Sequence, residues 1–376
     1  MNRGYFRSLL EPLLKLPTAP FHEDAVAAFV ADTLANTGLQ VATDSYGNVI
    51  ARRPSAGRSN ARLAFMAHMD HPGFEVVAHA DDGVVAAWYG GVQSEYFAEA
   101  KVRFHAGGET FPGVVKACEI DEQSTRVSRS RIVCERRPPV GSLGMWDLPA
   151  MEFVNGTLRA PALDDVAGVG LLLAMLLELG DRPLETEVWA LFTRAEEVGF
   201  VGAIALANTG RLPLSMPIIS VEMSKAMPGA SQGLGPVIRL GDRSSVFDHA
   251  VLLFMRDVAA DLRSRSEGFR YQQLLMDGGS CEATAFNAFG FRTAGLAVPL
   301  GNYHNQKPAG PNGPWVLDLE EINFTDLLNS VDLSIALCEG YQGLDIVRSH
   351  HRLTLLERTG QRLNRLYREQ RQRERR

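Results

Sequence analysis

Histidines and acidic residues stand close behind four short apolar runs of the sequence, and two further acids precede a fifth. These residues are His68, Asp70, Asp164, Asp165, Glu196, Glu197, Glu222 and His304. Imidazole nitrogens and carboxylate oxygens, without a thiolate among them, are ligands that suit divalent ions such as Zn, Co or Mn. A buried acid is costly unless it is paired or bound to a metal. The shared position of these residues beside apolar runs therefore favours a divalent metal site.

The apolar runs predict the buried strands that would carry these residues. They cover 61–67, 187–193, 216–222 and 293–300, and helices are predicted over 22–36, 166–179, 199–210, 248–263 and 318–340. Strands that alternate with helices predict an α/β fold, with a mostly parallel sheet flanked by helices on both faces. In such sheets the carboxyl ends of the strands line the ligand crevice. We therefore expect the acids and histidines to meet at one edge of the sheet.

The spacing within each motif indicates how the side chains divide the chemistry. Residues two apart share one face of a strand, so Asp70 can accept the second ring N–H of His68 and fix its tautomer. Glu196 and Glu197 are neighbours that point in different directions, so one can bind a metal while the other faces the substrate. Asp164 can bridge two cations with its two oxygens. Each motif alone also fits a structural role, such as an N-cap or a solvated acidic pair.

The segment 72–158 has a different texture, with short β-like runs between Gly, Asp and Pro turns and no long helical period. This pattern predicts a small β-rich, barrel-like domain. We therefore predict a catalytic α/β domain in two parts, 1–71 and 159–346, interrupted by the insertion 72–158. The insertion is a candidate for pairing subunits.

Composition sets the wider limits. The chain has 376 residues, is 45% hydrophobic and carries a formal charge of −6, which argues against disorder and against nucleic-acid binding by bulk charge. Its four cysteines are too sparse for a disulfide scaffold and fit free thiols in a reducing cytoplasm.

The N-terminus lacks the uninterrupted apolar region of a signal peptide. The longest uncharged apolar run, 166–177, is shorter than the roughly 20 residues that cross a bilayer. We expect a cytoplasmic protein with no membrane partner.

The C-terminal segment 347–376 departs from this balance, because it holds ten arginines and three glutamates, a local charge of +7. Leu355, Leu356, Leu363 and Leu366 follow rough helical spacing within it. The segment fits a solvated C-terminal helix, or a contact with a partner, with RNA or with another subunit. No nucleic-acid partner is expected for the rest of the chain.

Five motifs, in order, resemble one known family: the dinuclear metallo-aminopeptidases that include glutamyl aminopeptidase and the tetrahedral (TET) peptidases. The motifs are AHMDHPGF (67–74), ALDDVAG (162–168), RAEEVG (194–199), SVE (220–222) and YH (303–304). The resemblance extends over nearly the whole chain, up to about residue 345. It implies a zinc-exopeptidase-like fold, peptide substrates, two divalent metal ions and assembly into a homo-oligomer.

The family pattern also implies a role for each matched residue. Two cations would lower the pKa of a shared water molecule, and Glu196 would take its proton and return it to the leaving amine. The implied assignments are His68 and Glu222 in one metal site, Glu197 and His304 in the other, Asp164 as the shared ligand and Glu196 as the general base. Asp70, which its spacing places behind His68, is the second predicted catalytic residue.

The sequence departs from the family in three places. Glu222 stands where close relatives often have Asp. His71 and Pro72, beside the proposed site, replace a pair that in the family is usually an acidic residue followed by an apolar one. The segment GGSCEA (278–283) replaces a Gly-Thr-Asp pattern. We expect Cys281 and Glu282 to affect how the substrate is held, with Glu282 as a partner for its free α-amine.

Three other functions fit parts of the sequence. A metal-dependent deacylase or carboxypeptidase could use the same scaffold. A glycosidase would use the acidic pairs, but neighbours such as Glu196 and Glu197 do not flank a bond, and two strand-end histidines would go unexplained. A non-catalytic assembly protein could keep the fold, although every catalytic position is filled.

Overall fold

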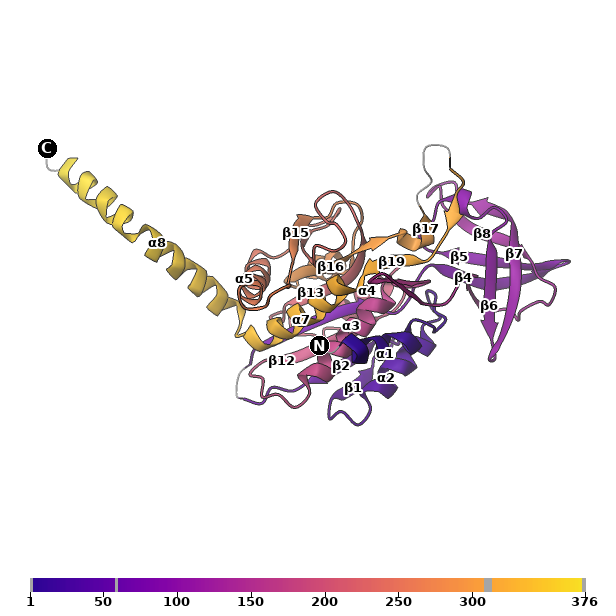
Figure 1. Ribbon diagram of the computed structural model, residues 1–376, viewed down its shortest axis with the longest axis horizontal. Coiled ribbons are helices and arrows are strands. Elements are labelled where there is room, and N and C mark those ends of the chain that lie inside the picture. Colours follow the sequence, from indigo (N-terminus) through magenta and orange to yellow (C-terminus); the bar gives the residue numbers. More distant parts are fainter. Residues whose placement is uncertain (1–2, 58–59, 308–312, 374–376) are drawn as a thin grey trace.

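The computed structural model describes residues 3–57, 60–307 and 313–373. A wide α/β body lies at the centre, a β-barrel adjoins one end of it, and the C-terminal helix extends away from the other end (Figure 1). This architecture confirms the predicted α/β fold with an inserted barrel-like domain.

Four parallel strands form the centre of the eleven-stranded main sheet. Their order is β12 (Glu187–Thr193), β3 (Arg62–His68), β13 (Ile218–Lys225) and β16 (Thr293–Gly301). All four coincide with the apolar runs that predict strands, because parallel strands between two helical layers are buried on both faces. Within β3, Leu63 and Phe65 face one layer, while Ala64 and Met66 face the other.

Antiparallel strands extend the main sheet on both sides. Beyond β12 lie β2 (Val49–Arg53) and β1 (Gln40–Thr43), and beyond β16 lie β19 (Glu320–Asn323), β11 (Thr157–Ala160) and β10 (Glu152–Val154). Strand β14 (Val237–Gly241) also pairs with β16 and carries β15 (Gln272–Leu275). The two-residue strands β17 (Gln306–Lys307) and β18 (Val316–Leu317) form a separate pair.

The helix predicted over 318–340 is wrong in its first part. Residues 320–323 form β19, and α7 (Phe324–Gly340) begins only after that strand. The Asn323 side chain accepts the backbone N–H groups of Thr325 and Asp326, so this residue caps the helix and separates it from the strand. Residues 320 and 322 are buried and their neighbours half-buried, which is strand alternation rather than a helical period.

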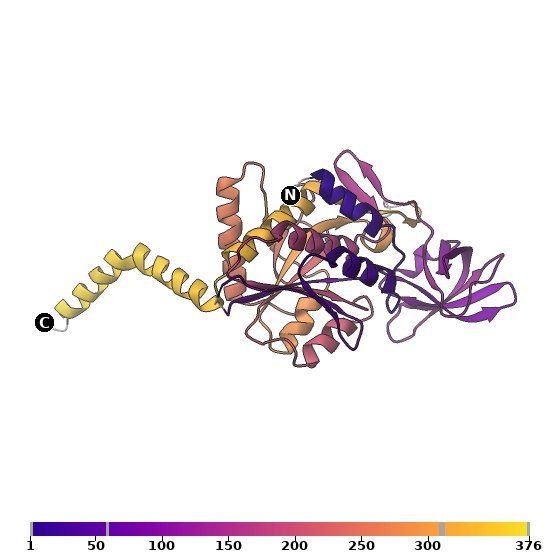
Figure 2. The same ribbon diagram turned by 90° about the horizontal axis from the view of Figure 1, so that it is seen from below.

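Two layers of helices cover the main sheet (Figure 2). One layer contains α1 (Arg3–Leu13), α2 (Asp24–Leu34), α3 (Val166–Leu179), α5 (His249–Arg265) and α7. The other contains α4 (Val201–Asn208) and α6 (Glu282–Ala288), which pack against the opposite side of β3. Helices α2, α3, α4 and α5 match predicted helices. Because α3 is buried along nearly its whole length, it places the acids at its N-terminus in the interior.

The inserted domain is a closed antiparallel barrel. Its strands, in order around the barrel, are β4 (Gly73–Ala80), β5 (Gly83–Tyr89), β8 (Val127–Val133), β7 (Glu109–Ile120), β6 (Lys101–Ala106) and β9 (Leu143–Trp146). Aromatic rings fill the interior, where the Phe74 ring centroid lies 4.6 Å from that of Trp88 and 5.0 Å from that of Trp146. The 3-10 helix η1 (Ser94–Tyr96) connects β5 to β6. The chain then returns to the main sheet through β10 and β11.

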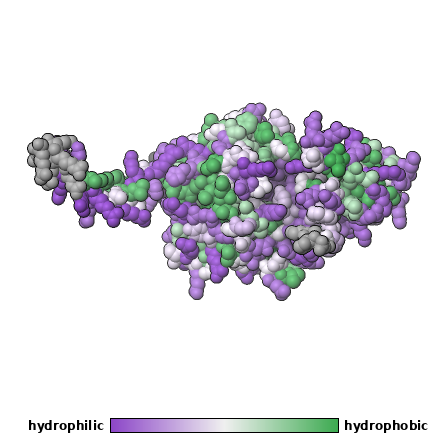
Figure 3. All heavy atoms as spheres, turned by 90° about the horizontal axis from the view of Figure 1, so that it is seen from above, coloured by the Kyte–Doolittle hydropathy of each residue, from purple (hydrophilic) through white to green (hydrophobic). Residues whose placement is uncertain are grey.

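Helix α8 (Leu344–Arg373) extends away from the body (Figures 1 and 2). Polar and apolar residues lie side by side on the coloured part of this helix in Figure 3. Its exposed apolar residues include Leu353, Leu355, Leu356, Leu363, Leu366 and Tyr367. The helical form agrees with the predicted spacing, and contact of the segment with a partner stays a prediction. Among the described helices, none combines the length and apolar character that a membrane crossing requires.

Candidate metal centre

The predicted metal-binding residues meet at the carboxyl ends of the parallel strands. His68 ends β3, Glu222 lies in β13, Glu197 follows β12, His304 lies in the 3-10 helix η2 (Tyr303–Asn305) after β16, and Asp164 precedes α3. They form two groups, His68 with Asp164 and Glu222, and Asp164 with Glu197 and His304. In each group the potential ligand atoms all lie within 4.8 Å of one another. Asp164 belongs to both triads.

Asp164 presents one carboxylate oxygen to each histidine. Its Oδ1 lies 3.4 Å from Nε2 of His68, and its Oδ2 lies 3.6 Å from Nε2 of His304. Glu222 Oε1 is 3.4 Å from the same His68 nitrogen, and Glu197 Oε1 is 3.0 Å from that of His304. The five side chains are at most 10% exposed. The two triads therefore form a buried arrangement in which two groups of potential metal ligands share one carboxylate.

Several polar atoms of these triads lack a hydrogen-bond partner within the described part of the chain. They are Asp164 Oδ1, Glu197 Oε1 and His304 Nε2. Burial, and next the Asp164 carboxylate, raises the pKa of Glu222 to about 8. Burial opposes protonation of His68, but nearby carboxylates, Glu196 first, raise its pKa well above the usual value. Divalent cations would supply the missing partners and offset the repulsion among the carboxylates, so the residues fit a metal site.

Backbone carbonyls hold the second ring nitrogen of each histidine. Nδ1 of His68 lies 3.1 Å from the carbonyl oxygen of Asp70, and Nδ1 of His304 lies 3.0 Å from that of Gly91. Because a carbonyl can only accept, each Nδ1 carries the proton and Nε2 is available to a metal. The Asp70 carboxylate lies farther from His68 Nδ1, at 3.5 Å, and accepts two backbone N–H groups of the turn after β12.

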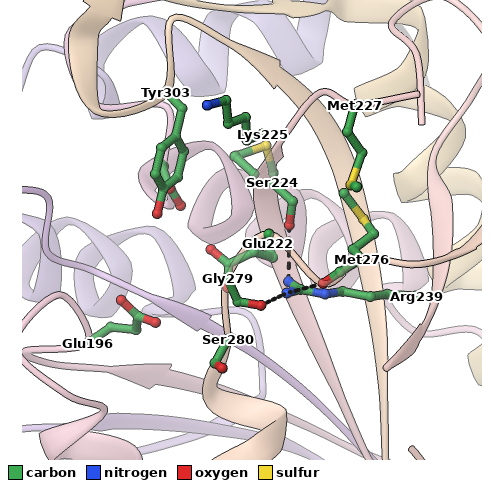
Figure 4. A pocket seen from close by; sticks show the side chains of 13 residues that line it. Glu196, Glu222, Ser224, Lys225, Met227, Arg239, Met276, Gly279, Ser280 and Tyr303 are labelled. Carbon is green, nitrogen blue, oxygen red and sulfur yellow. Dashed lines mark hydrogen bonds between the residues drawn. The ribbon is translucent and has the colours of Figure 1, made fainter. Parts of the chain in front are cut away.

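Glu196 lies at a cavity beside the two triads (Figure 4). Its Oε2 is 4.0 Å from Nε2 of His68, and its side chain is 11% exposed. Burial raises the pKa of Glu196 well above its usual value. Glu222, Ser280 and Tyr303 also line this cavity. A carboxyl group at the border between the triads and the cavity can exchange a proton with a molecule bound there.

Two residues at this centre were not singled out from the sequence. The Arg239 guanidinium is buried and donates to the carbonyl oxygens of Met276 and Gly279, so it holds the loop at one wall of the cavity (Figure 4). Glu320 contacts backbone groups of two proposed ligands, but it falls in the region wrongly predicted as helix. The sequence EEIN over 320–323 has no alternation of polar and apolar residues, so no signal in the sequence could have identified Glu320.

His71 lies beside the centre, as its place in the sequence suggests. Its Nδ1 is 2.6 Å from the carbonyl oxygen of Asp164, and its Nε2 is 3.1 Å from Oδ1 of Asn305. Cys281 and Glu282 are buried at the start of α6 and are not among the residues that line the cavity, although the preceding Ser280 is. Contact of Cys281 and Glu282 with a substrate stays a prediction.

Known proteins share this architecture. Residues 47–309 match the sequence model of a family described as M42 glutamyl aminopeptidase. An aminopeptidase from the archaeon Desulfurococcus kamchatkensis superposes with a TM-score of 0.75 at 22% identity, over 92% of this chain and 98% of that one. A TET aminopeptidase from a marine-sediment Thaumarchaeota archaeon gives 0.76 at 18% identity, over 92% and 99%. The Pyrococcus horikoshii TET1 peptidase, which can assemble into a tetrahedron or a large octahedral shell, gives 0.73 at 22% identity, over 89% and 100%. At these identities the structural matches show a common fold.

Proposed function

The chain belongs to the M42 glutamyl aminopeptidase family of metallo-aminopeptidases, and from this membership we propose that it releases N-terminal residues from peptides with two divalent metal ions. The observation that carries the proposal is the position of Asp164 between two buried triads, each with one imidazole and two carboxylates. An Asp whose two oxygens face two different histidines has the geometry expected of a bridging ligand.

The proposed ligands divide evenly between the two sites. His68 and Glu222 would hold one ion, Glu197 and His304 would hold the other, and Asp164 would bind both. Mixed imidazole and carboxylate ligands suit Zn, Co or Mn. When bound, the two ions lower the pKa of a shared water molecule and polarise the scissile carbonyl.

Glu196 is the proposed general base. It takes a proton from the attacking water as the water oxygen bonds to the carbonyl carbon, and it returns that proton to the amine nitrogen as the C–N bond breaks. Its place at the cavity, 4.0 Å from His68 Nε2, supports this role. Asp70 accepts the backbone N–H of Glu196 and so keeps the base at the cavity edge.

A substrate panel tests the proposed activity. Metal-loaded protein should hydrolyse aminoacyl substrates with a free N-terminus and leave matched substrates with an acetylated N-terminus intact. Preference for the acetylated substrates would indicate a deacylase, and release of C-terminal residues would indicate a carboxypeptidase. Metal analysis of the same preparation should give two divalent ions per chain and identify the metal.

Assembly is a separate proposal. We infer that the chain forms a homo-oligomer, since the TET1 peptidase of similar fold assembles into closed shells. The barrel adjoins one end of the α/β body and is the proposed contact between subunits. Light scattering on purified protein should give a mass that is a multiple of the 41.2 kDa chain, and a monomer would contradict the proposal.

A further inference from the structure

The side chain of Glu320 joins two proposed metal ligands that lie far apart in the sequence. Glu320 is fully buried on β19. Its Oε1 accepts the backbone N–H of His304 at 2.8 Å. Its Oε2 accepts the backbone N–H groups of Asp164, at 2.9 Å, and of Leu163, at 2.8 Å. One carboxylate therefore links the segment before α3 to the segment after β16.

This carboxylate is held by backbone groups rather than by a charged side chain. In the described part of the chain, Glu320 forms no ion pair with Lys or Arg, whereas the adjacent Glu321 points outward to Arg159 at 3.5 Å. A buried carboxylate is costly unless it is hydrogen-bonded, and bonds from N–H groups to a carboxylate are stronger than neutral ones. Three such bonds stabilise Glu320 and, in turn, fix the backbone that donates them.

The backbone around His304 needs such support. Asn302, His304 and Asn305 all adopt left-handed conformations, with φ of 52°, 54° and 63°. Residues other than Gly are strained there and keep this conformation only where their surroundings enforce it. The Asn302 side chain donates to the carbonyl oxygen of Leu319 at 2.8 Å, next to the bond from His304 to Glu320. The start of β19 therefore holds the conformation that aims the His304 ring at Asp164.

We propose that Glu320 is a positioning residue that sets the separation between Asp164 and His304, and with it the affinity of the second metal site. This inference rests on the proposed two-metal function. It assigns Glu320 no contact with either ion or with the substrate. Loss of its carboxylate should weaken the site formed by Asp164, Glu197 and His304 more than the site that contains His68.

The test compares two neighbouring glutamates of one strand. Metal-free wild-type, Glu320→Gln and Glu321→Gln proteins are titrated with Zn²⁺ by calorimetry and with Co²⁺ by visible absorption. Wild type and Glu321→Gln should bind two ions per chain. In Glu320→Gln one amide N–H would face a side-chain NH₂, and the affinity for the second ion should fall about 10–100-fold, as for other residues that orient metal ligands. Excess metal should restore turnover, because the ligands themselves are intact.

A second variant, Glu320→Asp, separates a loss of metal affinity from a folding defect. Glu320→Asp keeps the charge but is one methylene shorter, so it should retain the fold and still lose affinity for the second ion. Thermal unfolding of the metal-free proteins shows whether the fold persists. A lower melting temperature with unchanged affinity for both ions, in either variant, would make Glu320 purely structural and overturn the inference.

The possible failures are distinguishable. If wild type binds no divalent ions, the proposed function itself is wrong. If wild type binds two ions and the Glu320 variants bind both as tightly, the function stands and the positioning role is wrong. Equal losses in Glu320→Gln and Glu321→Gln would point to a general effect of β19, which also contradicts a specific role for Glu320.

Discussion

The carboxylate of Asp70 accepts the backbone N–H of Glu196 at 2.9 Å. Its second oxygen accepts the N–H of the next residue, Glu197, at 3.1 Å. Asp70 thereby ties the end of β3 to the turn after β12, where Ala195 has a φ of 51°. The proposed base Glu196 and the proposed ligand Glu197 are neighbours in that turn, so the positions of both side chains depend on the buried carboxylate of Asp70.

Replacement of Asp70 by Ala should therefore reduce turnover by about 10–100-fold, the usual range for residues that orient metal ligands. The two N–H groups would lose their acceptor, and the turn would shift relative to the cavity. Asp70→Asn, which keeps one acceptor oxygen, should fall between wild type and Asp70→Ala. Steady-state kinetics with parallel metal analysis measures the effect. Unchanged kcat in Asp70→Ala would show that the turn holds its shape without this contact.

Replacement of Glu196 and replacement of its neighbour Glu197 should impair the enzyme in different ways. Glu196→Gln removes the proposed base and should reduce kcat by about 10²–10⁴-fold while two ions still bind. Glu197→Gln removes a ligand and should release the second ion, with turnover partly recovered at high metal concentration. Metal content and kcat, measured on the same samples, separate the two cases. Full activity in Glu196→Gln would exclude this residue as the base.

The sequence predicted the strands that form the centre of the sheet, because buried parallel strands read as continuous apolar runs. Strands β3, β12, β13 and β16 have this property on both faces. Strand β19 does not, since it begins with two glutamates and owes its form to pairing with β11 and β16. A short strand that is stabilised mainly by pairing with its neighbours has no pattern of its own in the sequence, so it is assigned to the helix that follows.

The site could be predicted in its residue types but not in its supporting contacts. Convergence of His68, Asp164 and His304 follows from the parallel order of the strands. The acceptors of backbone N–H groups leave no such trace, because every residue other than proline carries an N–H group. From spacing alone, we expect the Asp70 carboxylate to accept the ring N–H of His68. In the structure the carboxylate instead accepts backbone N–H groups of the turn after β12, and the carbonyl oxygen of Asp70 lies nearer to His68 Nδ1 than the carboxylate does.

Removal of metal should lower stability as well as abolish activity. Without cations, the buried carboxylates of Asp164, Glu197 and Glu222 repel one another, and Asp164 Oδ1 and Glu197 Oε1 have no hydrogen-bond partner in the described part of the chain. A metal at 100 times its Kd should stabilise the fold by about 2.7 kcal/mol per site. Thermal unfolding with and without a chelator tests this, and re-addition of Zn²⁺, Co²⁺ or Mn²⁺ should restore both melting temperature and turnover. A chelated protein that keeps full activity would contradict the metal mechanism.

Deletion of residues 350–376 should leave hydrolysis unchanged. Most of α8 extends away from the body, and the leucines of the deleted segment are exposed rather than packed on the catalytic core. The deletion should, however, weaken retention on an anionic column, because it removes nine of the ten arginines of the basic segment. Kinetics, light scattering and column retention, measured on full-length and truncated chains, separate a role of the helix in hydrolysis from a role in assembly and a role in binding anions. A smaller assembly after truncation would assign α8 to subunit contacts, and lost activity in a correctly assembled protein would contradict its independence from the site.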